Sequence, residues 1–200
     1  MQEFIPYYVK IRGFNIYLLL DTEKKLIANS VPIKDRDTAW SIFSEVIKNS
    51  INIRISKSRV RIGKEHEKRI ANMIVDIVLG ISNNINKDFY KLIISPRYIA
   101  VLRLLRKIPR GRVTTYSSIA KLLGIHPRQV GIALRKNPLP VIYPCHRVVK
   151  SDRSIGGYIG SRYRWLKREL LVREGIRIVN DRVFKRYIID IAEMNLNGEV

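Results

Sequence analysis

Residues Tyr116–Lys136, with the sequence YSSIAKLLGIHPRQVGIALRK, decide how the second half of this chain folds. The pattern predicts a short helix over 116–123 and a second helix over 127–136. After Gly124 ends the first helix, only Ile125 and His126 precede the second, and this spacing is typical of a helix-turn-helix, although many helical hairpins share it. Arg128 and Arg135 are expected on the outward face of the second helix, where such a helix meets DNA.

The segments around this helix pair predict a mainly helical domain. Ser95 and Pro96 have the residue types of a helix start, and that helix should end before Pro109. Val141–Val149 has the composition of a buried extended segment, interrupted by Pro144. A tight loop at Gly156-Gly157-Tyr158 and a basic helix over Tyr163–Arg173 should follow.

The only cysteine of the chain lies in the pentapeptide Pro144-Cys145-His146-Arg147-Val148. One interpretation is a small buried hydrophobe, because a free cysteine is often buried without a chemical role. The other is a nucleophile whose thiolate is favoured by the neighbouring imidazole. The pentapeptide alone leaves both interpretations open.

The first half of the chain predicts an α/β domain. Segments rich in β-branched and aromatic residues indicate a meander of antiparallel strands, at Phe4–Ile11, Phe14–Leu20 and Leu26–Ile33. Helices are expected over Thr38–Lys48 and Lys64–Ile81. A polar stretch over 82–87 leads towards a boundary, so we expect an N-terminal domain over 1–93 and a C-terminal domain over 94–200.

The charge of the chain indicates a polyanionic partner. Its 38 Lys and Arg against 17 Asp and Glu give a formal net charge of +21. Residues 96–200 hold 22 basic and 7 acidic residues, whereas residues 1–95 hold 16 and 10. A membrane surface is the alternative partner, but the basic residues do not form one long amphipathic helix, so we expect nucleic acid and no membrane.

The cysteine and histidine content limits the other possibilities. One cysteine excludes an intramolecular disulfide and indicates a reducing, cytoplasmic location. With His66, His126 and His146 as the only histidines, a Cys/His zinc cluster cannot be assembled, so no metal is expected. The N-terminus lacks a cleavable signal pattern, and the apolar run Ile16–Leu20 is too short to span a bilayer.

Several stretches of the second half occur in a distinctive order: Ile108–Tyr116 (IPRGRVTTY), Arg128–Gly131 (RQVG), Asn137-Pro138, Pro144–Val148 (PCHRV) and Gly156–Tyr158 (GGY). Their order and spacing over roughly Ser95–Ile176 resemble the O6-alkylguanine-DNA alkyltransferases, or methylated-DNA–protein-cysteine methyltransferases, which repair alkylated guanine directly. The resemblance implies an RNase H-like α/β domain, with an antiparallel sheet and helices, before a C-terminal domain with a winged helix-turn-helix. It leaves an extension from about residue 177 without an assigned function.

The resemblance also implies roles for individual residues. Cys145 accepts the alkyl group, and His146 and Glu174 are linked to it through a bound water that takes the thiol proton. Tyr116 meets the DNA backbone and helps to protonate the departing guanine, and Asn137 is the hinge before the active-site segment. Arg128 enters the duplex and replaces the flipped nucleotide. The other implied positions are DNA contacts at Thr115, Gln129 and Arg135 and pocket residues Val148, Gly157, Tyr158 and Ile159.

The implied reaction is the irreversible transfer of an alkyl group from O6-alkylguanine, and from O4-alkylthymine, in double-stranded DNA to a monomeric protein. The product is a thioether, which has no acyl carbon for water to attack, so each molecule should act once and need no cofactor. Two rival hypotheses remain: a DNA damage sensor or helix-turn-helix regulator that transfers nothing, and a cysteine hydrolase that turns over.

Three positions depart from the family pattern. Arg153 stands where the family often has glycine, Ile159 where some members carry serine, and Ser161 where a second glycine is common. Because of these departures, the resemblance does not specify the alkyl-group preference or the hydrogen bonds of the pocket. Beyond the matched region, Val183–Ala192 is compatible with either a strand or a helix.

Overall fold

The computed structural model describes residues 4–51, 53–83, 85–191 and 194. The chain forms two compact units, one of Met1–Ile94 with Pro138–Ile142 and one of Ser95–Asn137 with Tyr143–Val200. Residues 138–142 were predicted to lie in the C-terminal domain, but in the structure they belong to the first unit. The reason is that the backbone N–H and side-chain amide of Asn29 donate to the carbonyls of Pro138 and Pro140, at 3.2 and 3.0 Å.

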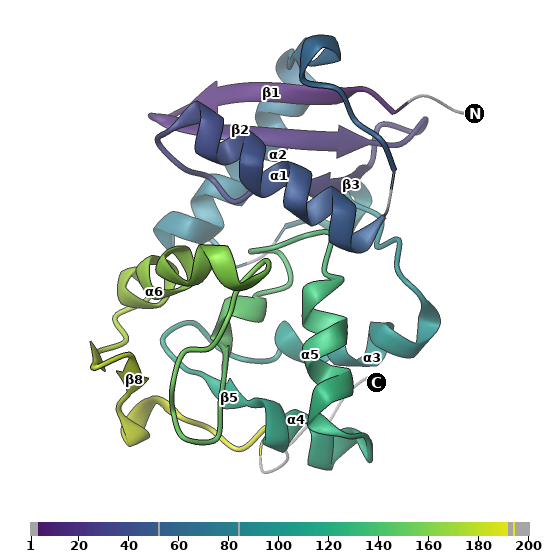
Figure 1. Ribbon diagram of the computed structural model, residues 1–200. Coiled ribbons are helices and arrows are strands. Elements are labelled where there is room, and N and C mark those ends of the chain that lie inside the picture. The colour runs from purple at the N-terminus through teal and green to yellow at the C-terminus, as the bar shows by residue number, and fades with distance from the viewer. Residues whose placement is uncertain (1–3, 52, 84, 192–193, 195–200) are drawn as a thin grey trace. The chain divides into compact units, whose positions relative to one another are not determined.

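The first unit is built on a four-stranded sheet and two long helices (Figure 1). Its elements are β1 (Pro6–Ile11), β2 (Phe14–Leu20), β3 (Leu26–Asn29), α1 (Arg36–Ser50), β4 (Arg61–Ile62) and α2 (Glu65–Leu79), with 3-10 helices at Lys57–Arg59 and Lys87–Phe89. The strand order is β3-β2-β1-β4. The antiparallel pairing of β1, β2 and β3 is as predicted, but β4 runs parallel to β1, so the sheet is mixed. A strand of two residues is too short to show an alternating pattern.

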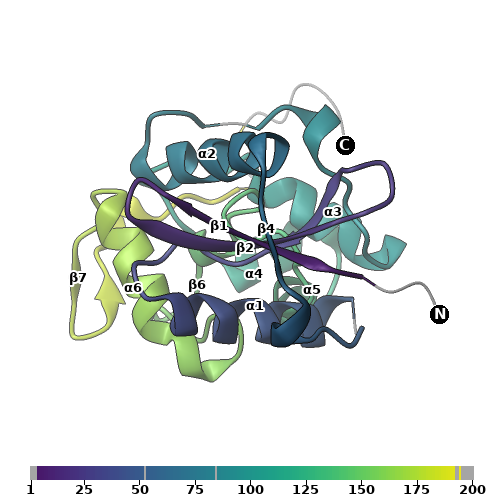
Figure 2. The same ribbon diagram turned by 90° about the horizontal axis from the view of Figure 1, so that it is seen from above.

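Helices α1 and α2 cover opposite faces of this sheet (Figure 2). Strand β2 is therefore buried at every position, because each of its faces is covered. The cluster under α1 includes the fully buried Tyr17 and Phe43. Helix α2 ends earlier than predicted: Gly80 adopts a φ of 77°, and Ile81, expected on the buried face, is 67% exposed.

The second unit is mainly helical (Figure 1). Its elements are α3 (Pro96–Leu105), β5 (Thr114–Thr115), α4 (Tyr116–Leu123), α5 (Pro127–Arg135), β6 (Val148–Val149), α6 (Arg164–Arg173), β7 (Ile178–Val179) and β8 (Arg182–Val183), with 3-10 helices at Cys145–Arg147, Ser161–Tyr163 and Lys185–Tyr187. Strands β5 and β6 pair in parallel, and β7 and β8 form an antiparallel hairpin. No helix in the described part of the chain has the length and apolar character needed to cross a membrane.

The predicted helix pair is confirmed, and its ends are capped by its own side chains. Thr115 Oγ1 accepts a hydrogen bond from the Ser118 N–H at 3.0 Å and starts α4. The α5 start is a capping box, in which His126 Nδ1 accepts from the Arg128 N–H and Gln129 Oε1 accepts from the His126 N–H. Val130 and Ala133 are the buried residues of α5, as predicted.

The C-terminal extension belongs to the core of the second unit. Residues 187–189 run beside Val113, which donates to the Tyr187 carbonyl at 2.9 Å and accepts from the Ile189 N–H at 2.8 Å. Ile178 and Val183 of the hairpin are buried in one cluster with Val113 and Val149. The segment Val183–Ala192 is thus neither one strand nor one helix over its described residues, and Ala192 lies outside them.

The segment Val141–Val149 is buried throughout, as predicted, but it is not extended. Residues Cys145–Arg147 form a 3-10 turn, with the Arg147 N–H donating to the Pro144 carbonyl at 2.9 Å. The proline ring fixes φ near the value that a tight turn requires, and Pro144 has a φ of −76°. Apolar composition predicts burial, but it does not distinguish a turn from a strand.

Candidate functional site

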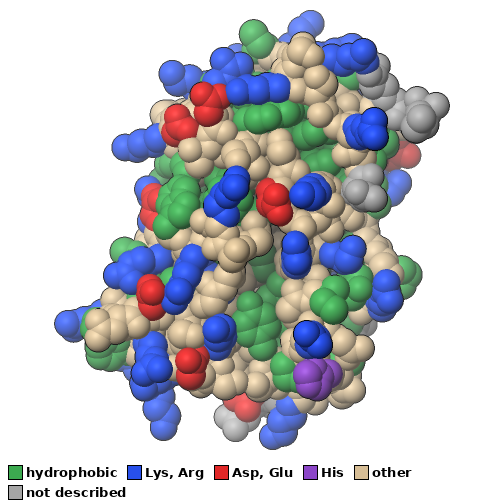
Figure 3. All heavy atoms as spheres, viewed as in Figure 1, with side chains coloured by type: hydrophobic (Ala, Val, Ile, Leu, Met, Phe, Trp, Pro, Cys, Tyr) green, Lys and Arg blue, Asp and Glu red, His purple; other side chains and the backbone are tan. Residues whose placement is uncertain are grey.

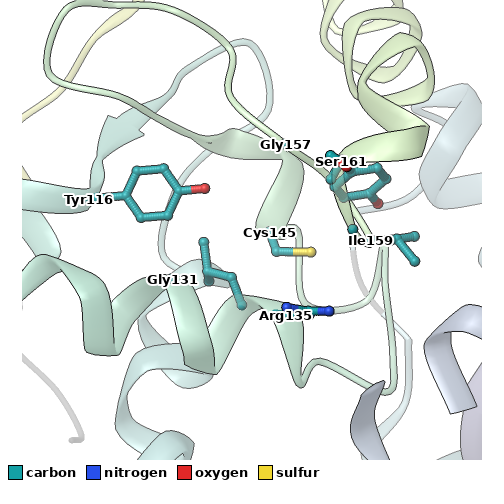
Figure 4. Close-up of a pocket in the computed structure, with 10 residues that line it drawn as sticks. Tyr116, Gly131, Arg135, Cys145, Gly157, Ile159 and Ser161 are labelled. Atoms are coloured by element: carbon teal, nitrogen blue, oxygen red, sulfur yellow. The ribbon is translucent and has the colours of Figure 1, made fainter. Parts of the chain in front are cut away.

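Cys145 is buried beside a cavity of about 360 Å³ within the second unit (Figure 4). Its Sγ lies 3.3 Å from Asn137 Nδ2, which also donates to the Tyr143 carbonyl at 2.8 Å. One amide thus supports both the thiol and the backbone that precedes it. Asn137, predicted as a hinge, is a direct neighbour of the Cys145 sulfur.

The walls of this cavity come from three elements. Tyr116 begins α4, α5 supplies Gly131, Leu134 and Arg135, and the segment 157–161 forms the other wall around Cys145. Figure 4 shows Tyr116 on one side of Cys145 and the 157–161 loop on the other. The volume is at the small end of the range for ligand pockets, so the cavity has room for one compact group.

His146 and Arg147 share one carboxylate. His146 Nε2 lies 2.9 Å from Glu174 Oε1, and Arg147 donates to both oxygens of Glu174 at 2.8 to 3.1 Å. Arg147 also donates to the Ile108 carbonyl at 2.7 Å. Glu174, at the end of α6, thus contacts both residues of the 3-10 turn directly. The implied water between Cys145 and His146 stays a prediction.

The electrostatics of these groups keep Glu174 charged and His146 neutral. Burial alone would raise the pKa of Glu174, but His146 and Arg147 outweigh burial and lower it to about 2. Burial lowers the pKa of His146, against the opposing effect of Glu174. Its Nδ1 is buried and has no hydrogen-bond partner among the described residues. A neutral imidazole with an unpaired ring nitrogen is a proton acceptor.

The thiol of Cys145 is held in its neutral form at rest. Burial raises its pKa, whereas the hydrogen bond from Asn137 and the charge of Lys167 act in the opposite direction. No hydrogen bond joins the thiol to the imidazole within the described residues, although the two residues are adjacent in the chain. Loss of the thiol proton therefore needs an intermediate carrier.

Lys167 is a functional candidate that the sequence analysis missed. Its side chain is fully enclosed, and Nζ donates to the Val148 carbonyl at 2.5 Å. Burial lowers the pKa of this ammonium to about 7, while nearby Cys145 acts to raise it. The sequence did contain a signal for it. Lys167 lies four residues after Tyr163 and four residues before Leu171, and both of these residues are buried, so helical spacing places the lysine on the buried face of α6.

Two tyrosines flank the thiol with their hydroxyl groups protonated. Burial, followed by the proximity of Cys145, raises the pKa of Tyr116 to about 12. Burial also raises the pKa of Tyr158, whose hydroxyl has no hydrogen bond of ordinary geometry among the described residues. Both phenols can therefore donate a hydrogen bond to a group that enters the cavity.

Of the remaining residues predicted for the site, some line the cavity and others lie outside it. Tyr158, Ile159 and Gly157 line the cavity with Arg135, which had been predicted as a DNA contact. Val148 is wholly buried and is not part of the cavity wall. Arg128 is exposed at the start of α5, whereas Thr115 and Gln129 use their side-chain oxygens as helix caps.

Two of the departures from the family pattern occupy left-handed backbone. Arg153 has a φ of 69°, which glycine adopts without the steric penalty that a side chain brings. Ile159 has a φ of 43° although its side chain is β-branched, so the pocket loop carries strain next to Cys145. Across the described residues, no group of three or more His, Cys, Asp or Glu side chains is placed to hold a metal ion.

Comparison with known proteins relates this site to a family. Residues 96–176 match the family described as "6-O-methylguanine DNA methyltransferase, DNA binding domain". A methylated-DNA–protein-cysteine methyltransferase from Pyrobaculum aerophilum is 51% identical over 88 residues, which are 44% of this chain and 58% of that protein. One from Saccharolobus solfataricus is 51% identical over 83 residues, or 42% and 53%. The chain thus spans little more than half the length of these relatives.

The fold is shared more widely than the sequence. The O6-methylguanine-DNA methyltransferase of Pyrococcus kodakaraensis superposes with a TM-score of 0.66 at 25% identity, covering 87% of this chain and 100% of that one. The O6-methylguanine DNA methyltransferase of Methanococcus jannaschii gives 0.58 at 27% identity, covering 86% and 95%. Residues 96–176 are therefore similar to the DNA-binding domain of the 6-O-methylguanine DNA methyltransferases, and the chain shares the fold of the solved structures of such proteins.

Proposed function

We propose that this protein repairs DNA by transferring the alkyl group of O6-alkylguanine to Cys145, irreversibly and once per molecule. The observation that carries the proposal is the position of Cys145: its sulfur borders a small cavity and accepts a hydrogen bond from Asn137, and the cavity wall includes the helix pair α4–α5. The residue range of the family match contains all of these groups. O4-alkylthymine presents an alkylated oxygen of the same kind and is the second proposed substrate.

The same family match supports a finer description of the fold. We infer that α4 and α5 are a winged helix-turn-helix, with α5 as the recognition helix, in a DNA-binding and alkyl-acceptor domain over 94–200. The mixed sheet between α1 and α2 supports an RNase H-like N-terminal domain over 1–93. We further propose that the protein acts as a monomer in the cytoplasm, where a reducing environment preserves the thiol.

The first chemical step is removal of the thiol proton. His146 Nδ1 is the acceptor in this proposal, and because no hydrogen bond joins it to Cys145, one water molecule carries the proton between them. The imidazolium that forms faces the carboxylate of Glu174 at 2.9 Å, which Arg147 keeps ionised. The positive charge of Lys167 lowers the thiol pKa further.

The second step is displacement at the alkyl carbon. The sulfur forms a bond to that carbon while the bond from carbon to O6 of guanine breaks, and its electron pair remains with the guanine. Tyr116, whose phenol stays protonated, donates a proton or hydrogen bond to the departing base. The product is a thioether on Cys145, and its stability makes the protein a reagent that is consumed.

Access to the alkyl carbon requires the nucleotide to leave the stack. The O6 substituent cannot be reached in line within a paired duplex, and a lesion that weakens pairing lowers the energy needed to flip it. On the face in Figure 3, Lys and Arg side chains outnumber Asp and Glu, which favours binding to the phosphate backbone. Exposed Arg128 is the side chain that would replace the extruded base.

The function is tested by titrating the protein against duplex DNA that contains O6-methylguanine. We expect repair to stop after one equivalent of lesion per protein molecule, with the methyl group retained by the protein. A cysteine hydrolase would continue to consume its substrate after one equivalent. A damage sensor would bind the lesion and leave the methyl group on the DNA.

Replacing Arg128 with alanine should separate base flipping from chemistry. We expect repair of a duplex lesion to slow at least tenfold, because the gap in the stack is left unfilled, while the reaction with free O6-benzylguanine keeps its rate. Lys121→Ala is the matched control, since it removes one exposed charge from α4. Equal losses on duplex and free base for Arg128→Ala would contradict the proposed role.

A further inference from the structure

The extension after the matched family region carries a cluster of cations around two aromatic rings, those of Phe184 and Tyr187. The guanidinium groups of Arg177 and Arg186 lie 5.2 and 6.0 Å from the centre of one ring, that of Phe184, which is 39% exposed. Arg186 also lies 4.9 Å from the ring of Tyr187 and donates to its hydroxyl at 2.9 Å. Stacking on the shared ring thus holds two like charges close together.

These two cations have no acidic partner in the described part of the chain. The nearby Asp181 pairs with Arg164 and Arg168 of α6, and Asp152 pairs with Arg182. Neither carboxylate is paired with Arg177 or Arg186. The positive potential also acts on Tyr187, whose pKa is lowered by the hydrogen bond from Arg186. Two guanidinium groups fixed in this way can donate hydrogen bonds to the oxygens of one phosphate or of adjacent phosphates.

The cluster is connected to the edge of the Cys145 cavity through the loop 150–156. On one side of this loop, Ser151 Oγ lies 2.7 Å from Ser117 Oγ of α4, and a Cβ at Gly156 would lie 4.0 Å from the Tyr116 hydroxyl. On the other side, Arg153 and Ile155 hydrogen-bond to Val183 and Asp181 of the hairpin, each at 3.0 Å. The hairpin therefore flanks the loop that leads into the cavity wall at Gly157.

A second connection fixes the cluster to the start of α4. Arg112 Nη1 donates to the backbone carbonyl of Arg186 at 2.5 Å, and Thr114 Oγ1 donates to the Ile189 carbonyl at 2.9 Å. The segment that carries Arg186 and Tyr187 thus has a fixed position relative to the helix pair. A duplex bound at α4 and α5 would meet it as a rigid surface.

We propose that the segment Arg177–Tyr187 is a second phosphate-binding site, which holds the backbone of the same DNA duplex to the side of the lesion. This inference rests on the proposed function, because the duplex is the partner that α4 and α5 would bring to the hairpin. It assigns a role to a segment outside the family match at 96–176. The contact is to the phosphate backbone, so it adds affinity without sequence preference.

The test compares binding of an unmodified duplex to the full-length protein and to the double variant Arg177→Gln/Arg186→Gln over a series of salt concentrations. We expect the slope of log affinity against log salt to become shallower by about two, since each lost phosphate contact contributes about 0.9. Affinity at low salt should fall roughly tenfold or more. The reaction with free O6-benzylguanine should be unchanged, which also shows that the variant is folded.

The control is Lys10→Gln/Lys68→Gln, which removes the same charge from exposed positions of the first unit. An equal loss in this control, or a wild-type slope in the hairpin variant, would overturn the second site. Failure of the proposed function has a different signature, because the wild-type protein would then not react with O6-benzylguanine at all.

Discussion

Replacing Glu174 with glutamine is expected to slow alkyl transfer about a hundredfold and to destabilise the protein by roughly 3–5 kcal/mol. The variant keeps the shape of the side chain but leaves Arg147 as a buried cation without its carboxylate. The imidazolium of His146, formed when the thiol loses its proton, also loses the charge that it faces. One substitution therefore acts on stability and on rate together.

The stability difference should depend on pH in a defined direction. Because the pKa of Glu174 is lowered to about 2 in the folded protein, its carboxylate stabilises the fold fully above the unfolded pKa of about 4.3. This contribution is lost as the pH falls towards 2. Denaturant unfolding at pH 7 and at pH 3 should therefore show a larger difference between wild type and variant at pH 7.

The matched control is Glu169→Gln, which removes a carboxylate from the exposed surface of α6, where it pairs with Arg173. A surface pair of this kind contributes about 0–1 kcal/mol, and the rate should not change. If Glu174→Gln behaved like Glu169→Gln in both measurements, the network of His146, Arg147 and Glu174 would have no role in activating the thiol.

Replacing Lys167 with methionine should stabilise the protein and slow its reaction. At pH values below about 7 the folded protein carries a buried ammonium, and the free energy of unfolding is reduced by the full cost of that burial. Between about 7 and 10.5 the unfolded chain binds more protons than the folded one, so wild-type stability rises with pH. Methionine removes this dependence.

At pH 6 the variant should be more stable by about 3 kcal/mol, allowing for the lost hydrogen bond to the Val148 carbonyl, and the gain should shrink as the pH rises towards 10. The rate with O6-benzylguanine should fall roughly tenfold at pH 7, and its pH profile should move to higher pH, because the charge that lowers the thiol pKa is gone. Arg168→Met, an exposed neighbour, is the control. An unmoved pH profile would remove Lys167 from the account.

The elements that sequence predicted well are those with a strong local signal. Helices α4 and α5 have capping side chains at both starts and a buried stripe at helical spacing, so their ends were predicted to within one residue. Cys145 was identified as a nucleophile by its resemblance to a family, and the cavity beside it agrees with that interpretation. The residues around Cys145 alone had left two interpretations open, a buried packing residue and a nucleophile.

The features that sequence missed depend on contacts between distant residues. Strand β4 is defined by its pairing with the edge of β1, and only two of its residues take part in that pairing. The direct contact of Glu174 with His146 joins residues 28 positions apart, and no local pattern in either segment specifies that they meet. Lys167 was visible as one lysine on an apolar helical face, but its proximity to Cys145 comes from the packing of α6.

The central claim is that Cys145 is the alkyl acceptor, and the most direct measurement is the mass of the peptide that contains it. After incubation with duplex DNA carrying O6-methylguanine, the account predicts that this peptide gains the mass of one methyl group, that fragmentation places it on the sulfur, and that Cys145→Ser gains none. Loss of the lesion with no added mass on the Cys145 peptide, or an intact lesion after prolonged binding, would contradict the account.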